Sequence, residues 1–243
     1  MQLTGHVGLA VGVSDLLFEA VRFALAVAEE TDGAFDPTVG HAMETRGFNR
    51  EHRTGAIVES HLTPPRDVSY RDVVCNADGK TVTLLRPLVL DLGAVAKGLA
   101  IDMAARELQP FRDFAIDAGG DLYLGGRNPD GELWSVGIRH PRIDGELIDV
   151  LRVSDKAVCT SGDYEKRVAA GHHILDPRTG VPAANAASVT VIAPTAMLAD
   201  AVATAAFVLG PAEGIELCES LGLEGLILTA NLERHETNGL RDE

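Results

Sequence analysis

The chain has 243 residues and a formal charge of −15, with 46% apolar and 23% charged residues. A chain of this size can bury a sizeable core, as one domain or as two closely packed lobes, and we expect a single domain over residues 1–243. The acidic balance argues against a protein that binds nucleic acid, because such binding depends on lysines and arginines that neutralise phosphates. A bound phosphate would need a local site built from a metal ion, a few basic side chains and backbone N–H groups.

The cysteines and the apolar segments limit the class of protein further. Cys75, Cys159 and Cys218 are widely spaced and form no CxxC pair, so we expect reduced, mostly buried thiols rather than a disulfide framework or a zinc site. No apolar stretch reaches transmembrane length, and glycines and Asp15 interrupt the start of the chain. As written, the protein is predicted to be cytoplasmic; a true start upstream that carries a signal would make it exported or membrane-associated.

The first third of the chain is predicted to hold helices and one hairpin. Apolar residues at helical spacing predict a helix over 15–30. Asp36-Pro37 suits the start of another helix, with Asp as its cap and Pro in its first position. Residues 44–67 have the composition of a surface loop. Val73–Leu85 reads as a hairpin in which Asp78-Gly79 supplies the positive φ of the turn.

The rest of the chain is predicted to be rich in strands. A helix is expected over 92–108, with Asp102 and Arg106 paired on its outer face. Short runs, many of them β-branched and divided by Gly, Pro or Asp, predict strands with hairpin spacing, and residues 231–243 read as a polar tail that frays. The fold class is therefore α+β, with mostly antiparallel sheet packed with helices. The predicted strands are Phe114–Asp117, Leu122–Leu124, Trp134–Ile138, Leu147–Val153, Ala157–Thr160, Ser188–Ala193 and Gly225–Thr229.

Asp200 and Thr204 are the most informative pair of polar residues. They stand four residues apart in an otherwise apolar helical stretch and therefore share one face of the helix. A carboxylate and a hydroxyl are oxygen ligands of the kind that Mg²⁺ takes, with waters and substrate phosphates completing its shell. The alternative is that Asp200 is only a charge at the helix start near Thr195 and that Thr204 is incidental.

Several segments in a fixed order carry a resemblance to a known family. The chain resembles the ApbE-like flavin transferases, FAD-dependent enzymes that attach FMN through its phosphate to a Thr or Ser of a partner protein. The family usually has some tens of residues before the helix at 15–30, including an early strand that helps to enclose the flavin, so an N-terminal segment is expected to be missing here. The matching segments are Gly33–Thr38, Asp91–Gly98, Asp117–Asp121, Thr160–Tyr164, His173–Gly180 and Ala199–Ala205.

The resemblance implies a metal site and a dinucleotide site. It supports Mg²⁺ on Asp200 and Thr204 and adds a main-chain carbonyl, for which Ala96 is the first choice and Ala94 the second. Lys97 becomes a contact of the pyrophosphate or ribose of FAD, although from its sequence context alone it could equally be a solvated charge.

The cleft that binds the dinucleotide is predicted from two further segments. Asp117, Gly119 and Gly120 would line it on the adenosine side, unless the glycine pair merely makes a tight turn. Ser161 is suited to bond a phosphate or the edge of the flavin. Nothing near Ser161 in the sequence activates it as a nucleophile.

His173 is the candidate general base. It matches the single histidine that the family carries before its Asp-Pro-Arg-Thr-Gly turn, and an imidazole suits proton transfer at neutral pH. The alternative is a structural histidine, because His172 and His173 enter a probable strand and only one of them can face a pocket. Arg178 would orient the loop or a phosphate, and Asp176 would brace the turn.

The predicted function is that of an enzyme, a magnesium-dependent FAD:protein FMN transferase. FMN would pass from FAD to a Thr or Ser hydroxyl of an acceptor protein, with release of AMP. Two alternatives remain open: a magnesium-dependent FAD pyrophosphatase that gives FMN and AMP, and a non-catalytic FAD-binding protein.

Overall fold

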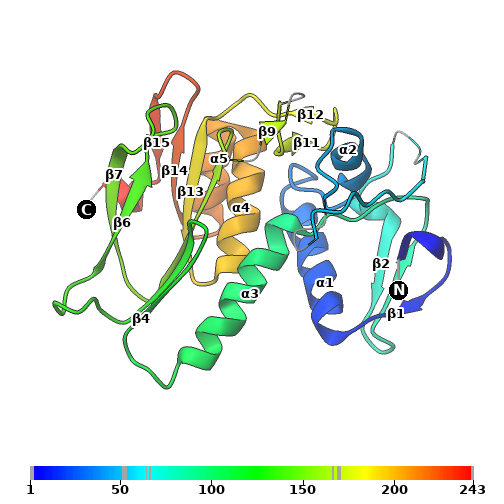
Figure 1. Ribbon diagram of the computed structural model, residues 1–243, viewed down its shortest axis with the longest axis horizontal. Helices are drawn as coiled ribbons and strands as arrows, with labels where there is room; N and C mark the ends of the chain where they lie inside the picture. Colours follow the sequence, from blue (N-terminus) through cyan, green and yellow to red (C-terminus); the bar gives the residue numbers. More distant parts are fainter. Residues whose placement is uncertain are drawn as a thin grey trace. The chain divides into compact units, whose positions relative to one another are not determined.

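The computed structural model describes residues 3–50, 54–63, 65, 67–165, 167–168 and 171–241. The contacts divide the chain into two compact units, Met1–Gly93 with Arg167–Pro182 and Ala94–Lys166 with Ala183–Glu243 (Figure 1). Each unit combines helices with antiparallel strands, which confirms the predicted α+β class. The single domain over residues 1–243 stays a prediction.

The first unit is built around a small sheet of order β1-β3-β2, with two further strand pairs, β9 with β10 and β11 with β12, all antiparallel. Its elements are η1 (Leu3–Gly5), β1 (Val11–Gly12), α1 (Asp15–Glu30), α2 (Gly40–Thr45), η2 (Tyr70–Asp72), β2 (Val73–Asn76), β3 (Thr81–Leu84), β9 (Arg167–Val168), β10 (Gly171–His172), β11 (Leu175–Asp176) and β12 (Val181–Pro182).

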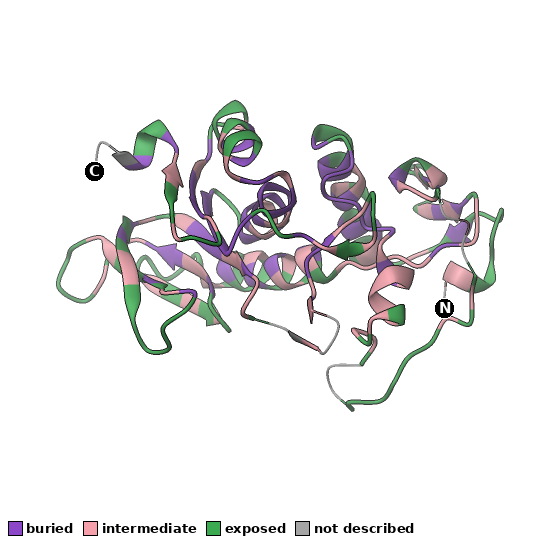
Figure 2. Cartoon of the chain, turned by 90° about the horizontal axis from the view of Figure 1, so that it is seen from above, coloured by how far each residue is buried: buried purple, intermediate pink, exposed green. Residues whose placement is uncertain are grey.

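Helix α1 and the β2–β3 hairpin confirm two of the predicted elements. The side chain of Ser14 caps α1 by accepting a hydrogen bond from the Leu17 N–H, and Phe18 and Val21 belong to a buried cluster that also contains Val82. Figure 2 shows buried residues gathered in the strands and on the inward sides of the helices. The positive φ of the hairpin turn was predicted for Asp78-Gly79 but falls on Lys80, at 45°. The prediction is wrong because the turn has four residues, and the left-handed position comes at its end.

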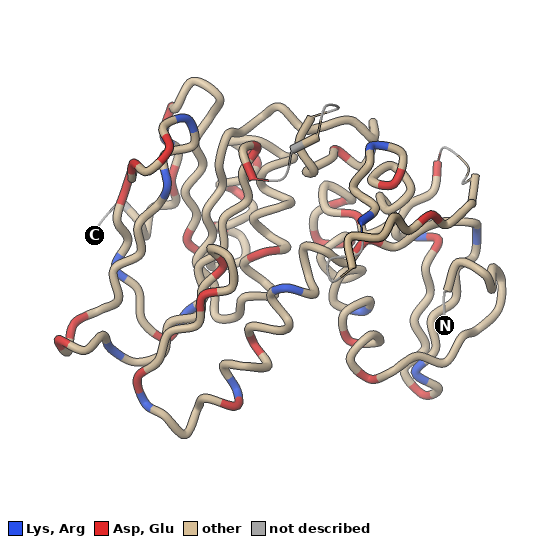
Figure 3. Tube along the Cα trace, in the orientation of Figure 1, with Lys and Arg blue, Asp and Glu red and all other residues tan. Residues whose placement is uncertain are grey.

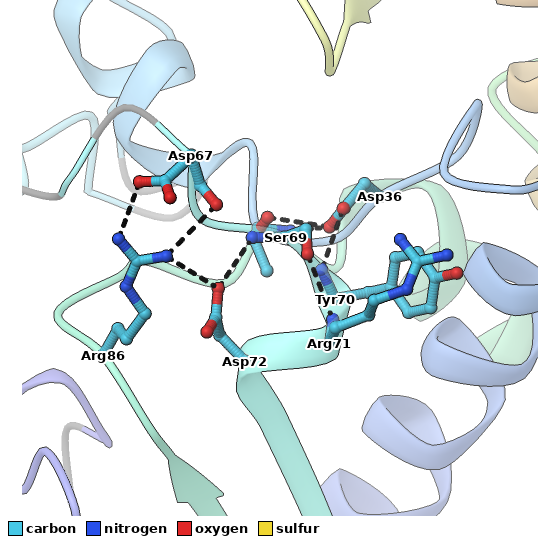
Figure 4. Close-up of polar contacts among 8 residues, drawn as sticks. Asp36, Asp67, Ser69, Tyr70, Arg71, Asp72 and Arg86 are labelled. Carbon is cyan, nitrogen blue, oxygen red and sulfur yellow. Dashed lines mark hydrogen bonds and ion pairs between the residues drawn. The ribbon is translucent and has the colours of Figure 1, made fainter.

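The helix predicted to start at Asp36-Pro37 begins instead at Gly40, and the Asp36 carboxylate is shared between the turn before this helix and a distant segment. One carboxylate oxygen accepts from the N–H and the hydroxyl of Thr38, both at 2.8 Å, and the other accepts from the Tyr70 N–H at 2.9 Å. Asp36 thus joins two loops that are distant in the sequence (Figure 4). Burial raises the pKa of Asp36, and these hydrogen bonds oppose the rise only in part.

The second unit is built around a six-stranded sheet of order β15-β14-β13-β8-β5-β4, in which every described neighbour is antiparallel. A separate pair, β6 with β7, is antiparallel too. The elements are α3 (Gly93–Leu108), β4 (Phe114–Ala118), β5 (Asp121–Gly125), β6 (Trp134–Arg139), β7 (Leu147–Val153), β8 (Lys156–Gly162), β13 (Ser188–Ala193), α4 (Ala196–Leu209), α5 (Pro211–Ser220), β14 (Glu224–Leu228), β15 (Arg234–Glu236) and α6 (Asn238–Arg241). All of the strands predicted from the sequence in this region are present.

The register of the large sheet decides which side chains share a face. Tyr123 lies opposite Ala157, so Asp121, Cys159 and Ser161 point to the same side, because alternate residues of a strand share a face. Helix α4 covers that side: the Cys159 thiol lies 3.6 Å from the Ala196 carbonyl oxygen. The opposite face packs on β6 and β7 in a core of Leu124, Val136, Ile138, Leu151, Val153, Val158, Ile192, Leu226, Leu228 and Leu240.

The end of the chain is more ordered than its polar composition suggests. Residues 231–243 were predicted to fray, but β15 pairs with β14 and Leu240 is buried in the core of the second unit. The prediction is wrong because composition does not show that Thr237 exchanges hydrogen bonds with Gly225, through the Thr237 backbone N–H and hydroxyl. These contacts tie the segment to β14.

The predicted helix over 92–108 is confirmed as α3, but its polar face is used differently. Asp102 was predicted to pair with Arg106 on the outer face, yet its carboxylate accepts from the Ala196 N–H at 2.7 Å and the Met197 N–H at 3.0 Å. The N–H groups in the first turn of a helix have no acceptor within the helix, and they lie at the positive end of the helix dipole. The Asp102 carboxylate accepts from two such groups of α4. Asp102 therefore fixes α3 to the start of α4.

The buried thiols agree with the expectation from the spacing of the cysteines. Cys75, Cys159 and Cys218 are free thiols, and Cys159 and Cys218 are buried. Burial raises the pKa of Cys218 to about 11, so this thiol stays protonated at neutral pH. Among the described residues, no helix combines the length and the apolar character needed to cross a bilayer.

Candidate functional site

Helix α4 and strand β8 bring the predicted metal ligand Thr204 next to Ser161, for which a bond to a phosphate or to the edge of the flavin is predicted. Thr204 lies one turn after Asp200 and its hydroxyl donates to the Asp200 carbonyl at 3.1 Å. The same hydroxyl lies 3.4 Å from the hydroxyl of Ser161, which the register of β8 turns toward α4. Helix α4 starts at Thr195, whose side chain caps it, so Asp200 stands beyond the first turn rather than at the helix start.

The second group of predicted residues surrounds Lys97, in the first turns of α3. Its ammonium lies 2.6 Å from the Asp121 carboxylate and donates to the Gly119 carbonyl at 3.3 Å. Burial disfavours the charge on Lys97, but the carboxylates of Asp121 and Asp200 outweigh this effect and hold the pKa of Lys97 above its usual value. Asp200 is therefore close enough to Lys97 to act on its charge, which connects the two groups.

The Gly119–Gly120 pair forms the two-residue turn between β4 and β5. Both glycines have positive φ, 64° and 91°, as a tight hairpin turn requires, and a Cβ on either would meet nothing within 4 Å. The Asp117 carboxylate accepts from the Gly120 N–H at 2.9 Å. The glycine pair thus makes a tight turn, and contact with a dinucleotide stays a prediction for these residues.

His173 and Arg178 belong to the first unit. The β10 strand ends at His172, which is buried and accepts from the Ile174 N–H at 3.3 Å. The His173 ring lies 6.3 Å from the ring of Phe48 and is partly exposed. Arg178 is exposed and pairs with Asp176 at 3.2 Å, and the Asp176 carboxylate also accepts from the Arg178 N–H, so Asp176 braces the turn as predicted.

The oxygen atoms of Asp200, Thr204 and Ser161 suit a hard cation that needs only one or two carboxylates from the protein. Among the described residues, no group of three or more His, Cys, Asp or Glu side chains could hold a metal ion. Asp200 supplies a carboxylate, and Thr204 and Ser161 supply hydroxyls within contact of each other. Mg²⁺ is commonly held by one or two carboxylates together with waters and substrate phosphates, so this set suits it when a phosphate is present.

Asp121 is the residue of this site that sequence reasoning missed. It belongs to the Asp117–Asp121 motif, but only Asp117 and the glycines were singled out. The sequence did contain one signal for this residue. Asp121 is the first residue of a strand after a tight turn, and it stands two positions before Tyr123, on the face that helices cover. What the sequence could not show is that Lys97 lies beside it.

Comparison with known proteins identifies the family. The family model described as "ApbE family" matches residues 3–227. The chain belongs to the ApbE family. The solved ApbE protein of Thermotoga maritima is 33% identical, with a TM-score of 0.85 over 98% of this chain and 81% of that one. The resemblance seen in the sequence motifs is thereby confirmed.

Two curated relatives of this ApbE chain carry the name FAD:protein FMN transferase. The one from Haemophilus influenzae is 30% identical over 239 residues, which cover 91% of this chain and 67% of the relative. The one from Vibrio cholerae is 32% identical over 218 residues, which cover 86% of this chain and 65% of the relative. The ApbE chain described here thus spans about two thirds of the length of these relatives.

Proposed function

We propose that this chain is a magnesium-dependent FAD:protein FMN transferase, which moves FMN from FAD to a Thr or Ser hydroxyl of an acceptor protein. Membership of the ApbE family and the names of the curated relatives support the reaction class. The observation that carries the assignment to a site is the meeting of the Ser161 and Thr204 hydroxyls at 3.4 Å, one turn from Asp200, whose carboxylate helps to raise the pKa of Lys97.

The transfer has a simple balance of bonds. The acceptor oxygen forms a bond to the FMN-side phosphorus of FAD, the bond from that phosphorus to the bridging oxygen breaks, and AMP leaves with that oxygen. The hydroxyl proton must go to a base, and His173 stays the predicted base. No step needs a nucleophile on the enzyme.

Each residue of the site has a task in this reaction. Asp200, Thr204 and Ser161 would hold Mg²⁺, with the Ala96 carbonyl, or that of Ala94, as the predicted additional ligand. When bound, the ion would offset the negative charge of the pyrophosphate, which is the main obstacle to attack at phosphorus. Lys97 would add a second positive charge to offset that of the pyrophosphate, and this charge would stay in place throughout the transfer of FMN.

Removing the Asp200 carboxylate tests the proposal. The Asp200→Ala variant is expected to lose at least about a hundredfold of its turnover, because a lost electrostatic partner of the transferring group costs this much or more. The assay incubates the protein with FAD, MgCl₂ and an acceptor that contains a Thr attachment site, and follows flavin fluorescence on the acceptor band and AMP in solution. Glu216→Ala, an exposed acid of α5, is the matched control and should keep full activity.

The same assay separates the alternatives. Flavin on the acceptor together with AMP supports the transferase. Free FMN and AMP without labelled acceptor would replace it with a pyrophosphatase, and unchanged FAD would indicate a binding protein. Full activity of Asp200→Ala in the presence of EDTA would contradict the role of the metal.

A further inference from the structure

Asp121 is a buried carboxylate whose two oxygens have different partners. The residue is 5% exposed. One oxygen lies 2.6 Å from the Lys97 ammonium, and the other accepts from the Thr160 N–H at 3.3 Å. Strand pairing between β5 and β8 stops at Leu122, so no β5 carbonyl accepts from the Thr160 N–H. The Asp121 carboxylate accepts this hydrogen bond instead. A carboxylate this deeply buried needs a cation beside it, and Lys97 is that cation.

Lys97 is held by its neighbours but still has hydrogen-bonding capacity. A lysine ammonium has three N–H donors. Asp121 and the Gly119 carbonyl take two of them, and the described part of the chain records no third hydrogen-bond partner. The Lys97 side chain is 40% exposed, so its remaining donor can reach an anion from solvent.

The Asp121 carboxylate is the anchor of this ammonium. Lysine has a long, flexible stem, so without Asp121 the Lys97 ammonium would no longer be held in one position.

We propose that Asp121 is a positioning residue: it fixes the Lys97 ammonium in place and aims its free donor at a phosphate oxygen of the dinucleotide. This inference rests on the proposed function, and it assigns to the site a residue that touches neither substrate nor metal. Asp121 acts through Lys97. Its loss is therefore expected to weaken binding of FAD in the presence of Mg²⁺ without unfolding the protein.

The test is a double-mutant cycle on FAD affinity, measured by titration calorimetry with FAD and MgCl₂. Asp121→Asn and Lys97→Gln are each expected to raise the dissociation constant of FAD about tenfold, the effect of one lost charged hydrogen bond. The double variant should bind no more weakly than Lys97→Gln alone, because Asp121 has no effect once Lys97 is gone. Asp121→Glu keeps the charge and should recover most of the affinity.

A matched control removes an ion pair of the same sheet. Glu224 pairs with Lys156 at 2.7 Å, and Glu224→Gln should bind FAD as tightly as the unaltered protein. Circular dichroism verifies that each variant is folded. If Asp121→Asn does not fold, the FAD affinities of Lys97→Gln and Asp121→Glu test the proposal. A dissociation constant of Lys97→Gln equal to that of the unaltered protein would overturn it by itself.

The outcomes separate this inference from the function on which it rests. If the unaltered protein binds no FAD, both the proposed function and the inference fail. If it binds FAD and the effects of the two single substitutions add in the double variant, Asp121 has only a structural role and the inference alone fails. Effects that do not add, together with recovery in Asp121→Glu, support the positioning role.

Discussion

At the scale of single residues, buried or half-buried carboxylates connect segments that are far apart in the sequence. Asp36 accepts from the Tyr70 N–H, Asp102 from the first N–H groups of α4, and Asp121 from the Thr160 N–H. In each case a backbone donor without a carbonyl partner is satisfied by a side chain, which avoids the cost of an unpaired buried N–H. These three carboxylates therefore stabilise the fold in addition to contributing to the negative charge of the molecule.

Asp36 gives a prediction for pH. Its pKa in the folded protein lies above the usual 3.8, with burial as the main cause. A carboxyl group with a raised folded pKa contributes stability that is fully present below its unfolded pKa and lost as the pH rises through its folded pKa. The free energy of unfolding of the unaltered protein, minus that of Asp36→Asn, should therefore fall as the pH is raised from about 3 to about 7.

Urea titrations of both proteins at several pH values measure this difference. Asp36→Asn cannot titrate at this position, so effects of pH on all other groups cancel in the subtraction. A difference that rises with pH would mean that the three hydrogen bonds to Asp36 outweigh its burial. Such a result would reverse the sign of the argument.

At the scale of elements, the contact between α3 and α4 depends on a glycine. A Cβ on Gly98 would lie 2.5 Å from the Ala196 carbonyl oxygen and 2.5 Å from the Met197 N. These are backbone atoms at the helix start that Asp102 also holds, so they cannot move aside cheaply. The close approach brings Lys97, the residue before Gly98, to the Asp121 side of the sheet.

Gly98→Ala should therefore destabilise the protein, although alanine is the better helix former. The expected loss is about 1–3 kcal/mol of unfolding free energy, the usual cost of overpacking a close contact. Ala100→Ser, on the exposed side of the same helix, should change stability by less than about 0.5 kcal/mol. Denaturant titration measures both; a Gly98→Ala variant as stable as the original would show that α3 can shift away from α4.

At the scale of the whole molecule, the charge is strongly negative but is not concentrated in one stretch. Acidic and basic positions are interspersed along the trace in both units (Figure 3), and the formal charge is −15. An anionic dinucleotide is not attracted by such a molecule overall, so local cations must hold it. Under the proposed function, Lys97 and the metal would supply that positive charge.

Because the molecule repels an anionic ligand unless a cation is bound beside it, FAD and Mg²⁺ are expected to stabilise the protein only together. A ligand that binds the folded state raises the free energy of unfolding, and a concentration about 100 times its dissociation constant adds about 2.7 kcal/mol. FAD with MgCl₂ should raise the melting temperature by about 5 °C or more, and EDTA should remove most of the shift. Scanning fluorimetry measures it. An equal shift with FAD and EDTA would show that the ion is not needed for binding.

Much of the fold was determined by local sequence signals. The helices at 15–30 and 92–108 and the strands of the second unit follow from apolar periodicity and from Gly, Pro and Asp punctuation, which act within a few residues. The family likewise followed from short motifs in order. The chemistry of Asp200 and Thr204 could be proposed because helical spacing alone places them on one face.

Only the tertiary structure decided which distant partner each polar group meets. The sequence did not show that Asp102 serves α4 rather than Arg106, that Asp36 serves Tyr70 rather than a helix start, or that Asp121 holds Lys97. It also did not show that the last residues pair with β14. The physical reason is that packing of the elements leaves some N–H groups and charges without a local partner, and these bonds supply that partner. Which elements pack together is not encoded in any short segment of the chain.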